Sequence, residues 1–177
     1  MINYFRTFLI IKLVQLRIKP KQRLYFEQEV KAYGVLSTGL LIMAFNKKGI
    51  IIINPNNNYK HIKITENNRN FIPSSICILS DDTIVISNDY DETINVYTIV
   101  NDKLIQKYSI KGKKVKQFLI MNNNLFCSWN DNLITIFKKI KKEIIQVSTI
   151  IEIDSQICAM TYLQSRKLFF IIHYMEV

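Results

Sequence analysis

The sequence predicts an all-β domain built from a repeated unit of four short strands. Three asparagines, Asn46, Asn88 and Asn130, recur 42 residues apart, each at the end of an apolar run. Isoleucine, tyrosine and phenylalanine are abundant, and such residues favour the pleated, half-buried surface of a sheet. Helices are disfavoured in IINPNNNYK by Pro55, and in NDKLIQKY by the turn residues around it.

Each unit has the same order of strands, separated by polar turns. The predicted first strands are residues 30–36, 74–79 and 115–121, and the second strands are 40–46, 83–88 and 125–130. The third strands are 49–53, 93–97 and 133–137, and the fourth are 59–64, 103–110 and 143–150. At the ends, 5–13 and 23–30 fall where third and fourth strands belong, and 156–163 and 167–174 where first and second strands belong.

Four short strands in roughly 42 residues is the period of a β-propeller blade. The chain therefore divides into a half blade (1–29), three blades (30–70, 71–112 and 113–154) and a second half blade (155–177). A β-sandwich or a barrel is the alternative, since both contain short strands at regular spacing. The recurrence of asparagine at the same corner favours the propeller.

The stretch DETINVYTI, from Asp91 to Ile99, resembles the third strand of WD-repeat β-propellers, where an acidic turn precedes an alternating strand with an aromatic near its end. The stretch DNLITIF at 131–137 is a second copy. No unit has the family's Gly-His pair, and Tyr97-Thr98 and Phe137-Lys138 replace its Trp-Asp. The resemblance implies a degenerate, partial propeller without residues for the family's Asp-His-Ser-Trp network.

Closure of such a propeller has three possible forms. Most propellers have about six to eight blades, more than this chain supplies. The two half blades could pair into a four-bladed ring, another chain could complete an open arc, or the sequence could be a piece of a longer propeller. An open arc would expose apolar edges.

Composition narrows the function classes. The 177 residues suffice for one domain with a core, and the net charge of +10 is compatible with nucleic acid, anionic lipid or acidic proteins as partners. Arginine is rare, so bidentate recognition of phosphate is poorly provided for. The apolar stretch at 7–16 is too short for a transmembrane helix.

Catalytic and metal-binding motifs are lacking. Cys77, Cys127 and Cys158 have neither metal-ligand spacing nor a disulfide pattern, and each is expected to be a small buried hydrophobe. The acidic residues after Asn88 lack the glycine and distal glutamate of a calcium loop. Ser74 and Ser75 lack the glycines of a nucleophile elbow. We expect no enzyme and no cofactor.

Candidate binding residues gather where loops share a face of the propeller. Loops between second and third strands lie on the same face as loops between fourth and first strands, so a lysine cluster lies beside an acidic corner. The predicted partner-binding residues are Tyr90, Asp91, Trp129, Lys111, Lys113, Lys114 and Lys116. Trp129 could instead fill the space between blades. Lys138, Lys139, Lys141 and Lys142 are expected on the opposite face, with Asp81 and Asp82, as a solvated corner.

These observations predict a non-catalytic protein–protein interaction module, as a segment of a larger scaffold or regulatory protein. Loops on a rigid frame usually carry binding. The alternative is an electrostatic binder of nucleic acid or anionic lipid that acts through its lysines. The absence of a disulfide pattern and of glycosylation sequons favours the cytoplasm, with the nucleus as the other candidate compartment.

Overall fold

All described elements of the protein are β-strands. The computed structural model describes residues 29–54, 60–63, 69–100, 103–111, 114–152, 156–163 and 165–173. The first sheet contains β1 (Val30–Val35), β2 (Leu41–Phe45), β3 (Gly49–Asn54) and β4 (Lys60–Lys63). The second contains β5 (Pro73–Ile78), β6 (Ile84–Asn88), β7 (Thr93–Val100) and β8 (Lys103–Lys111). The third contains β9 (Gln117–Asn122), β10 (Leu125–Trp129), β11 (Leu133–Ile140) and β12 (Glu143–Glu152). A two-stranded sheet follows, made of β13 (Ile157–Leu163) and β14 (Leu168–His173).

Within each sheet, neighbouring strands are consecutive in sequence and antiparallel. The predicted strands from 30 onward are found, but β7 and β11 run three residues past their predicted ends, because each continues into a tight hairpin with the fourth strand. Lys138 and Lys139 therefore lie in β11, and the prediction that they form a loop corner is wrong. The predicted strand at 5–13 lies outside the described residues, as do residues 23–28 of the predicted strand at 23–30 and the half blade at 1–29 except for Glu29.

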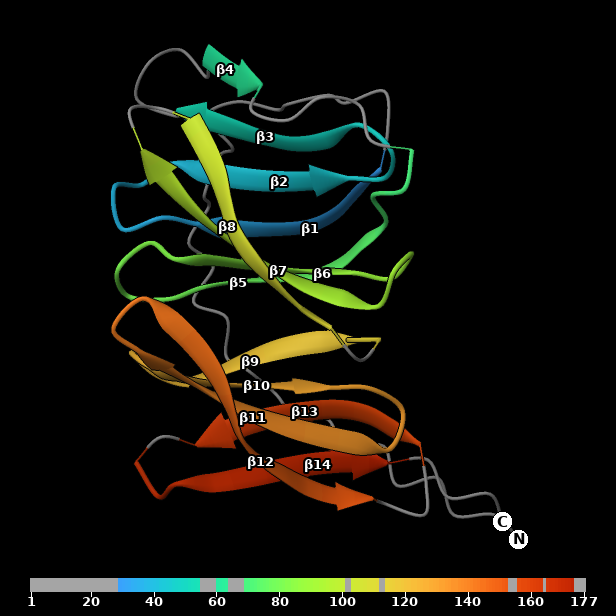
Figure 1. The fold of residues 1–177 in the computed structure, drawn as a ribbon. Coiled ribbons are helices and arrows are strands. Elements are labelled where there is room, and N and C mark those ends of the chain that lie inside the picture. The colour runs from blue at the N-terminus through green and yellow to red at the C-terminus, as the bar shows by residue number, and fades with distance from the viewer. Residues whose placement is uncertain are drawn as a thin grey trace, which may run out of the picture.

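The sheets lie face to face in a single row (Figure 1). Their first strands approach one another in order, since β1 contacts β5, β5 contacts β9, and β9 contacts β13. The fourth strands lie farthest from this line, and β8 and β12 cross their sheets at a steep angle in Figure 1. Such rotation follows from the right-handed twist that accumulates across a sheet.

Three apolar clusters fill the spaces between successive sheets. The first joins Ile42 and Ile52 to Ile84 and Ile86 across the first and second sheets. The second and third sheets meet through Val85, Val96, Phe118, Phe126 and Phe137. The rings of Phe126 and Phe137 stack with their centroids 5.2 Å apart, and Phe118 meets Phe126 edge to face. A third cluster joins the third sheet to β13 through Cys127, Trp129, Ile134, Ile157 and Met160. A middle sheet is therefore buried on both faces, and its strands are apolar at consecutive positions.

The recurring asparagines lie at the corners between second and third strands, where Asn88 and Asn130 bond to backbone groups, whereas the side-chain oxygen of Asn46 is buried without a hydrogen-bond partner among the described residues. The side-chain oxygen of Asn88 accepts a hydrogen bond from the Ile72 amide at 2.7 Å, and its nitrogen donates to the Asn70 carbonyl. Asn130 accepts bonds from the amides of Asn132 and Leu133 within its own corner. A short amide side chain thus satisfies backbone groups that the end of the strand leaves unpaired.

The turns between first and second strands connect successive sheets. The Asp82 carboxylate accepts two hydrogen bonds from Ser37, one from its amide at 2.7 Å and one from its hydroxyl at 2.6 Å. Ser80, at the position equivalent to Ser37, donates to the Asn123 carbonyl in the next turn. Asp82 has a φ of +58°, in a region that aspartate tolerates better than most residues.

The row of sheets has an apolar end at β14. Leu168, Phe170 and Ile172 alternate along one face of this strand and are exposed. Phe170 is 53% exposed, whereas Val85 and Cys127, at equivalent positions of β6 and β10, are 0% exposed because the next sheet covers them. Cys158 of β13 is also exposed, so the prediction of a buried thiol is wrong there, although it is right for Cys77 and Cys127.

The first prediction concerns β7, whose Ile94 side chain is buried against the third sheet. The substitution Ile94→Asp should destabilise the protein by several kcal/mol, because a carboxylate there would lack any partner. Val100→Asp, at the exposed end of the same strand, serves as the control and should change stability little. Urea unfolding followed by circular dichroism measures both, and a stable Ile94→Asp protein would disprove the assignment of β7.

Candidate functional site

The loops that the structure describes lie on two opposite faces of the row of sheets. We call the first the connector face; it carries the corners 46–48, 89–92 and 130–132 and the connections 69–72 and 114–116. The second is the hairpin face, with the turns 36–40, 79–83, 123–124, 141–142 and 165–167. In Figure 1 the corner from β2 to β3 lies at the right edge, and the turn from β1 to β2 at the left.

The acidic corner after β6 uses its two aspartates for its own structure. Asp89 accepts a hydrogen bond from the Ser74 hydroxyl at 2.6 Å, and its amide donates to the Ile72 carbonyl. Asp91 accepts a bond from the Thr93 hydroxyl at 2.7 Å. Tyr90 lies between them and is 58% exposed. The corner therefore presents an aromatic ring to solvent on a backbone that its own carboxylates hold in place.

The predicted lysine cluster is spread over two corners of the connector face. Lys111 pairs with Thr93 in the β7–β8 register, which places it beside the acidic corner, and Lys114 is exposed. Lys116 lies farther along, with its ammonium 3.6 Å from Asp131 and 3.3 Å from the Ile157 carbonyl. Lys113 lies outside the described residues.

Asp131 anchors the next corner to β13. Its carboxylate accepts a hydrogen bond from the Gln156 side chain at 3.0 Å, and its carbonyl accepts one from the Ile157 amide. The Gln156 hydrogen bond, followed by the charges of Lys116 and Lys114, lowers the pKa of the Asp131 carboxyl below its ordinary value. The carboxylate is therefore ionised wherever the protein is near neutral pH.

Trp129 is not a surface residue. It is 2% exposed and lies in the cluster between the third sheet and β13, so the structure agrees with the interpretation that it fills the space between sheets. The Lys116 ammonium lies 5.6 Å from the centre of its ring, a distance suited to a cation–π contact. Lys116 and Trp129 are thus brought together, but they stabilise the packing of β13 and leave no indole surface for a partner.

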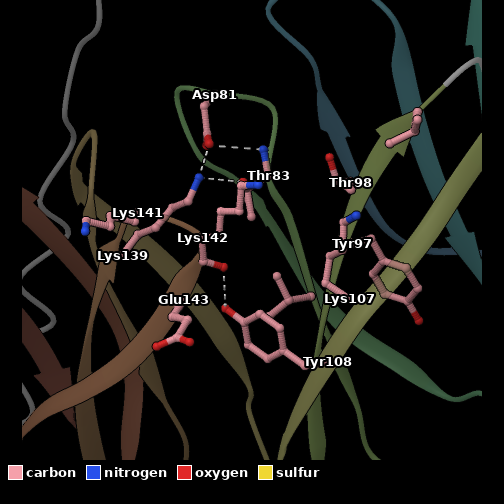
Figure 2. Close-up of a pocket in the computed structure, with 12 residues that line it drawn as sticks. Asp81, Thr83, Tyr97, Thr98, Lys107, Tyr108, Lys139, Lys141, Lys142 and Glu143 are labelled. Atoms are coloured by element: carbon pink, nitrogen blue, oxygen red, sulfur yellow. Dashed lines mark hydrogen bonds and ion pairs between the residues drawn. The ribbon is translucent and has the colours of Figure 1, made fainter.

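A pocket of about 490 Å³ opens on the hairpin face between the second and third sheets (Figure 2). Asp81 and Thr83 line it from the turn before β6, and Tyr97 and Tyr108 from β7 and β8. The third sheet contributes Lys139 and the turn at 141–142. No sequence motif pointed to this pocket, since it exists only where two sheets meet.

Lys139 is buried in the wall of the pocket and forms an ion pair with Asp81. Its ammonium also donates to the Thr83 hydroxyl at 2.7 Å, as Figure 2 shows. Burial lowers the pKa of Lys139 from its ordinary value. The Tyr108 hydroxyl accepts a hydrogen bond from the Ile144 amide at 2.6 Å, and burial raises the pKa of Tyr108. These bonds join residues of the second sheet to residues of the third.

The described residues were compared with the requirements of a metal site and of a reactive thiol. No cluster of three or more histidine, cysteine, aspartate or glutamate side chains suited to a metal occurs among these residues. Burial raises the pKa of the Cys77 thiol well above its usual range and that of Cys127 to about 12, so both remain protonated and unreactive. In the described residues, no helix has the length and apolar character needed to cross a membrane.

The sequence and the arrangement of four-stranded sheets were compared with known proteins. No family model matches the sequence. No curated protein matches it either. Among solved structures, the chain is similar to the β-propeller domain of Cps50 (Swd1) from Myceliophteria thermophila, with a TM-score of 0.61 and 11% identity over 82% of this chain and 51% of that one. The WD40 repeats of RRP9 match with a TM-score of 0.61 and 9% identity over 84% and 52% of the two chains. A chain of a mitotic checkpoint complex matches with a TM-score of 0.60 and 12% identity over 82% and 48%.

The fold is a partial WD40-type β-propeller. Each four-stranded sheet is a blade, and the first strands of successive blades lie nearest the propeller axis. The chain spans about half the length of the propeller structures it matches. The alternative of a sandwich or barrel is wrong, because the blades are separate sheets stacked in one row.

A serine network links the second and third blades near the axis. The Ser74 hydroxyl lies 2.6 Å from Asp89, 2.7 Å from the Val115 carbonyl and 2.8 Å from the Ser87 hydroxyl. A hydroxyl has one proton, so Ser74 shares it between the two acceptors while Ser87 donates to Ser74. Ser75 accepts a hydrogen bond from the Phe118 amide at 3.0 Å. Ser74 and Ser75 are therefore structural residues of a blade junction.

The second prediction concerns the ion pair at the same blade junction. Asp81→Asn should destabilise the protein by about 1–3 kcal/mol, because the buried Lys139 ammonium would lose its counter-charge. Lys139→Met should cost less, since an apolar chain of similar length replaces the buried charge and Asp81 remains half in solvent. Chemical denaturation gives both values, and a larger loss in Lys139→Met than in Asp81→Asn would contradict this account.

Proposed function

We propose that this propeller is a non-catalytic protein-binding module of an intracellular scaffold or regulatory protein. The observation that carries the proposal is the acidic corner of the connector face, where Tyr90 projects into solvent from a backbone fixed by Asp89 and Asp91. An exposed aromatic ring on a rigid loop loses little conformational entropy on binding, and such residues dominate the energy of many interfaces.

The surroundings of Tyr90 favour a protein surface as the partner. Lys111 lies beside the corner across the β7–β8 pair, and Glu92 at the corner is exposed. Protein interfaces typically have aromatic residues at the centre and polar or charged residues at the rim, and charges of both signs around the Tyr90 ring fit this pattern. Affinity for a polyanion comes from lysine and arginine, and the carboxylates of this corner would oppose it. In this proposal Tyr90, Asp91, Lys111, Lys113, Lys114 and Lys116 belong to the binding face, with Asp91 and Lys116 shaping the corners.

The third prediction tests the connector face against a matched surface. The double variant Tyr90→Ala/Lys111→Ala should weaken partner binding about tenfold or more, because it removes the central ring and its neighbouring charge. Tyr33→Ala/Lys103→Ala removes an exposed tyrosine and an exposed lysine elsewhere and should bind as the unmodified protein does. Cross-linking in a cell extract, with quantitative mass spectrometry, compares the partners, and an equal loss in both variants would contradict the proposal.

The alternative function is electrostatic binding of nucleic acid or anionic lipid, which the net charge of +10 favours. Contacts made by lysine and phosphate alone weaken steeply between about 50 and 200 mM salt. Measurable affinity for duplex DNA or phosphatidylserine vesicles at about 50 mM salt, with a steep loss by about 200 mM, would support this alternative, and no affinity at about 50 mM salt would contradict it.

We also propose that the chain is a segment of a larger propeller. The support is the apolar face of β14, where Phe170 is exposed although its counterparts Val85 and Cys127 are covered by the following blade. Its outer edge has no partner strand among the described residues, whereas β2, β6 and β10 each pair with a third strand. Exposed apolar faces and free edges of this kind are normally covered in native proteins.

The fourth prediction follows from this open end. Phe170→Asp should leave the melting temperature of the isolated chain nearly unchanged and reduce its concentration-dependent association, because the side chain already lies in solvent. Val147→Asp, a control of equal exposure on β12, should change neither property. Calorimetry and light scattering measure the two effects. A large drop in the melting temperature of Phe170→Asp would show that the chain covers this face by itself.

A further inference from the structure

The pocket on the hairpin face is a second candidate site, separate from the binding surface proposed on the connector face. It lies between the second and third blades, at the opposite end of the strands from Tyr90. Its volume of about 490 Å³ falls in the range of sites that hold a small ligand or a few side chains of a peptide.

The rim of the pocket carries unbalanced positive charge. Lys107, Lys141 and Lys142 line it and are exposed, and no carboxylate among the described residues forms an ion pair with any of them. Glu143 is the one acidic side chain at the rim, since the charge of Asp81 is neutralised by Lys139. The rim therefore carries three ammonium groups without an ion-pair partner and only one such carboxylate.

One wall of the pocket is apolar. Val96 and Val100 of β7 line it, whereas the ring of the lining residue Tyr97 packs in the cluster between the first and second sheets. Burial, followed by the charge of Asp91, raises the pKa of Tyr97 to about 12, so its phenol is neutral at physiological pH. A ligand that reaches this wall must bring an apolar group between its charges.

Hydrogen bonds across the blade junction hold the pocket in shape. Lys139 of the third blade bonds to Asp81 and Thr83 of the second. At the other side, the Tyr108 hydroxyl accepts a hydrogen bond from the Ile144 amide. The same hydroxyl lies 3.5 Å from the Lys142 carbonyl, and Figure 2 shows this contact as a dashed line. The lysine rim is thus set on a frame fixed before any ligand arrives, which lowers the entropy cost of binding.

We propose that this pocket binds an acidic peptide segment of a partner protein, with an apolar side chain against Val96 and Val100 and flanking carboxylates at Lys107 and Lys142. The inference rests on the proposed protein-binding function but assigns a second site, on the opposite face. It adds the chemistry of the bound segment: glutamate or aspartate on both sides of one apolar residue.

Phosphate ligands fit the pocket less well. Its cations are all lysines, and neither described arginine, Arg69 or Arg166, lines it, so the planar fork that binds phosphate in two-pronged fashion is missing. Binding of single-stranded nucleic acid usually adds bases stacked on exposed aromatic rings. Here Tyr97 is buried and Tyr108 is half-buried, with its hydroxyl engaged.

The test uses fluorescein-labelled pentapeptides and the full chain, read by fluorescence anisotropy at low salt. Glu-Glu-Leu-Glu-Glu should bind at least about tenfold more tightly than Gln-Gln-Leu-Gln-Gln, and more tightly than Glu-Glu-Ala-Glu-Glu. Lys107→Gln/Lys142→Gln should weaken the first peptide about tenfold. The matched control is Lys47→Gln/Lys167→Gln, which removes the same charge from exposed lysines that belong neither to this pocket nor to the proposed connector-face site and should leave this affinity unchanged.

Three outcomes would overturn the inference. These are failure of the acidic peptide to bind at millimolar concentration, an equal loss in both double variants, and tighter binding of oligo-dT or inositol hexakisphosphate than of the peptide with loss in Lys107→Gln/Lys142→Gln. The connector-face proposal fails separately, when Tyr90→Ala/Lys111→Ala keeps the partners of the unmodified protein. Each failure is therefore recognisable on its own.

Discussion

The structure depends on one interaction, the burial of each blade face against the next blade. A single antiparallel sheet of four short strands cannot bury enough apolar surface to be stable alone. Here Ile84 and Ile86 point to one neighbour and Val85 to the other, so the middle blade is stable only as part of the row. The same requirement explains β14, whose outer face is as apolar as the buried faces but has no described blade against it.

Polar contacts act at both rims of each blade junction and set the blades in register. Near the axis, Ser74 and Ser75 join the second blade to the third, while Asp82 bonds to Ser37 across the preceding junction. On the hairpin face, the Lys139–Asp81 pair crosses the junction where β7 and β8 diverge from the third blade. The pocket lies between this ion pair and the hydrogen bond that joins Tyr108 of β8 to Ile144 of β12.

The sequence was sufficient to predict the strands, but not which residues of other blades pack against them. The recurrence of Asn46, Asn88 and Asn130 located the strands from residue 30 onward and indicated a propeller, because corners and alternation are local properties. Burial of Trp129 and Lys139 arises from contact with another blade, which no local pattern records. The adjacent serines Ser74 and Ser75 carried no motif for the same reason. Their partners, Val115 and Phe118, lie more than 40 residues away in sequence.

The distribution of charge connects the fold to its binding chemistry. Every described aspartate is engaged within the protein: Asp81 with Lys139, Asp82 with Ser37, Asp89 with Ser74, Asp91 with Thr93, and Asp131 with Gln156 and Lys116. Exposed lysines such as Lys107, Lys114 and Lys142 have no ion-pair partner in the described residues. The fold thus uses its described aspartates to fix corners and junctions and leaves ammonium groups free on both faces. A partner that carries acidic side chains therefore complements either face, and the apolar groups beside the lysines determine which acidic segment each face prefers.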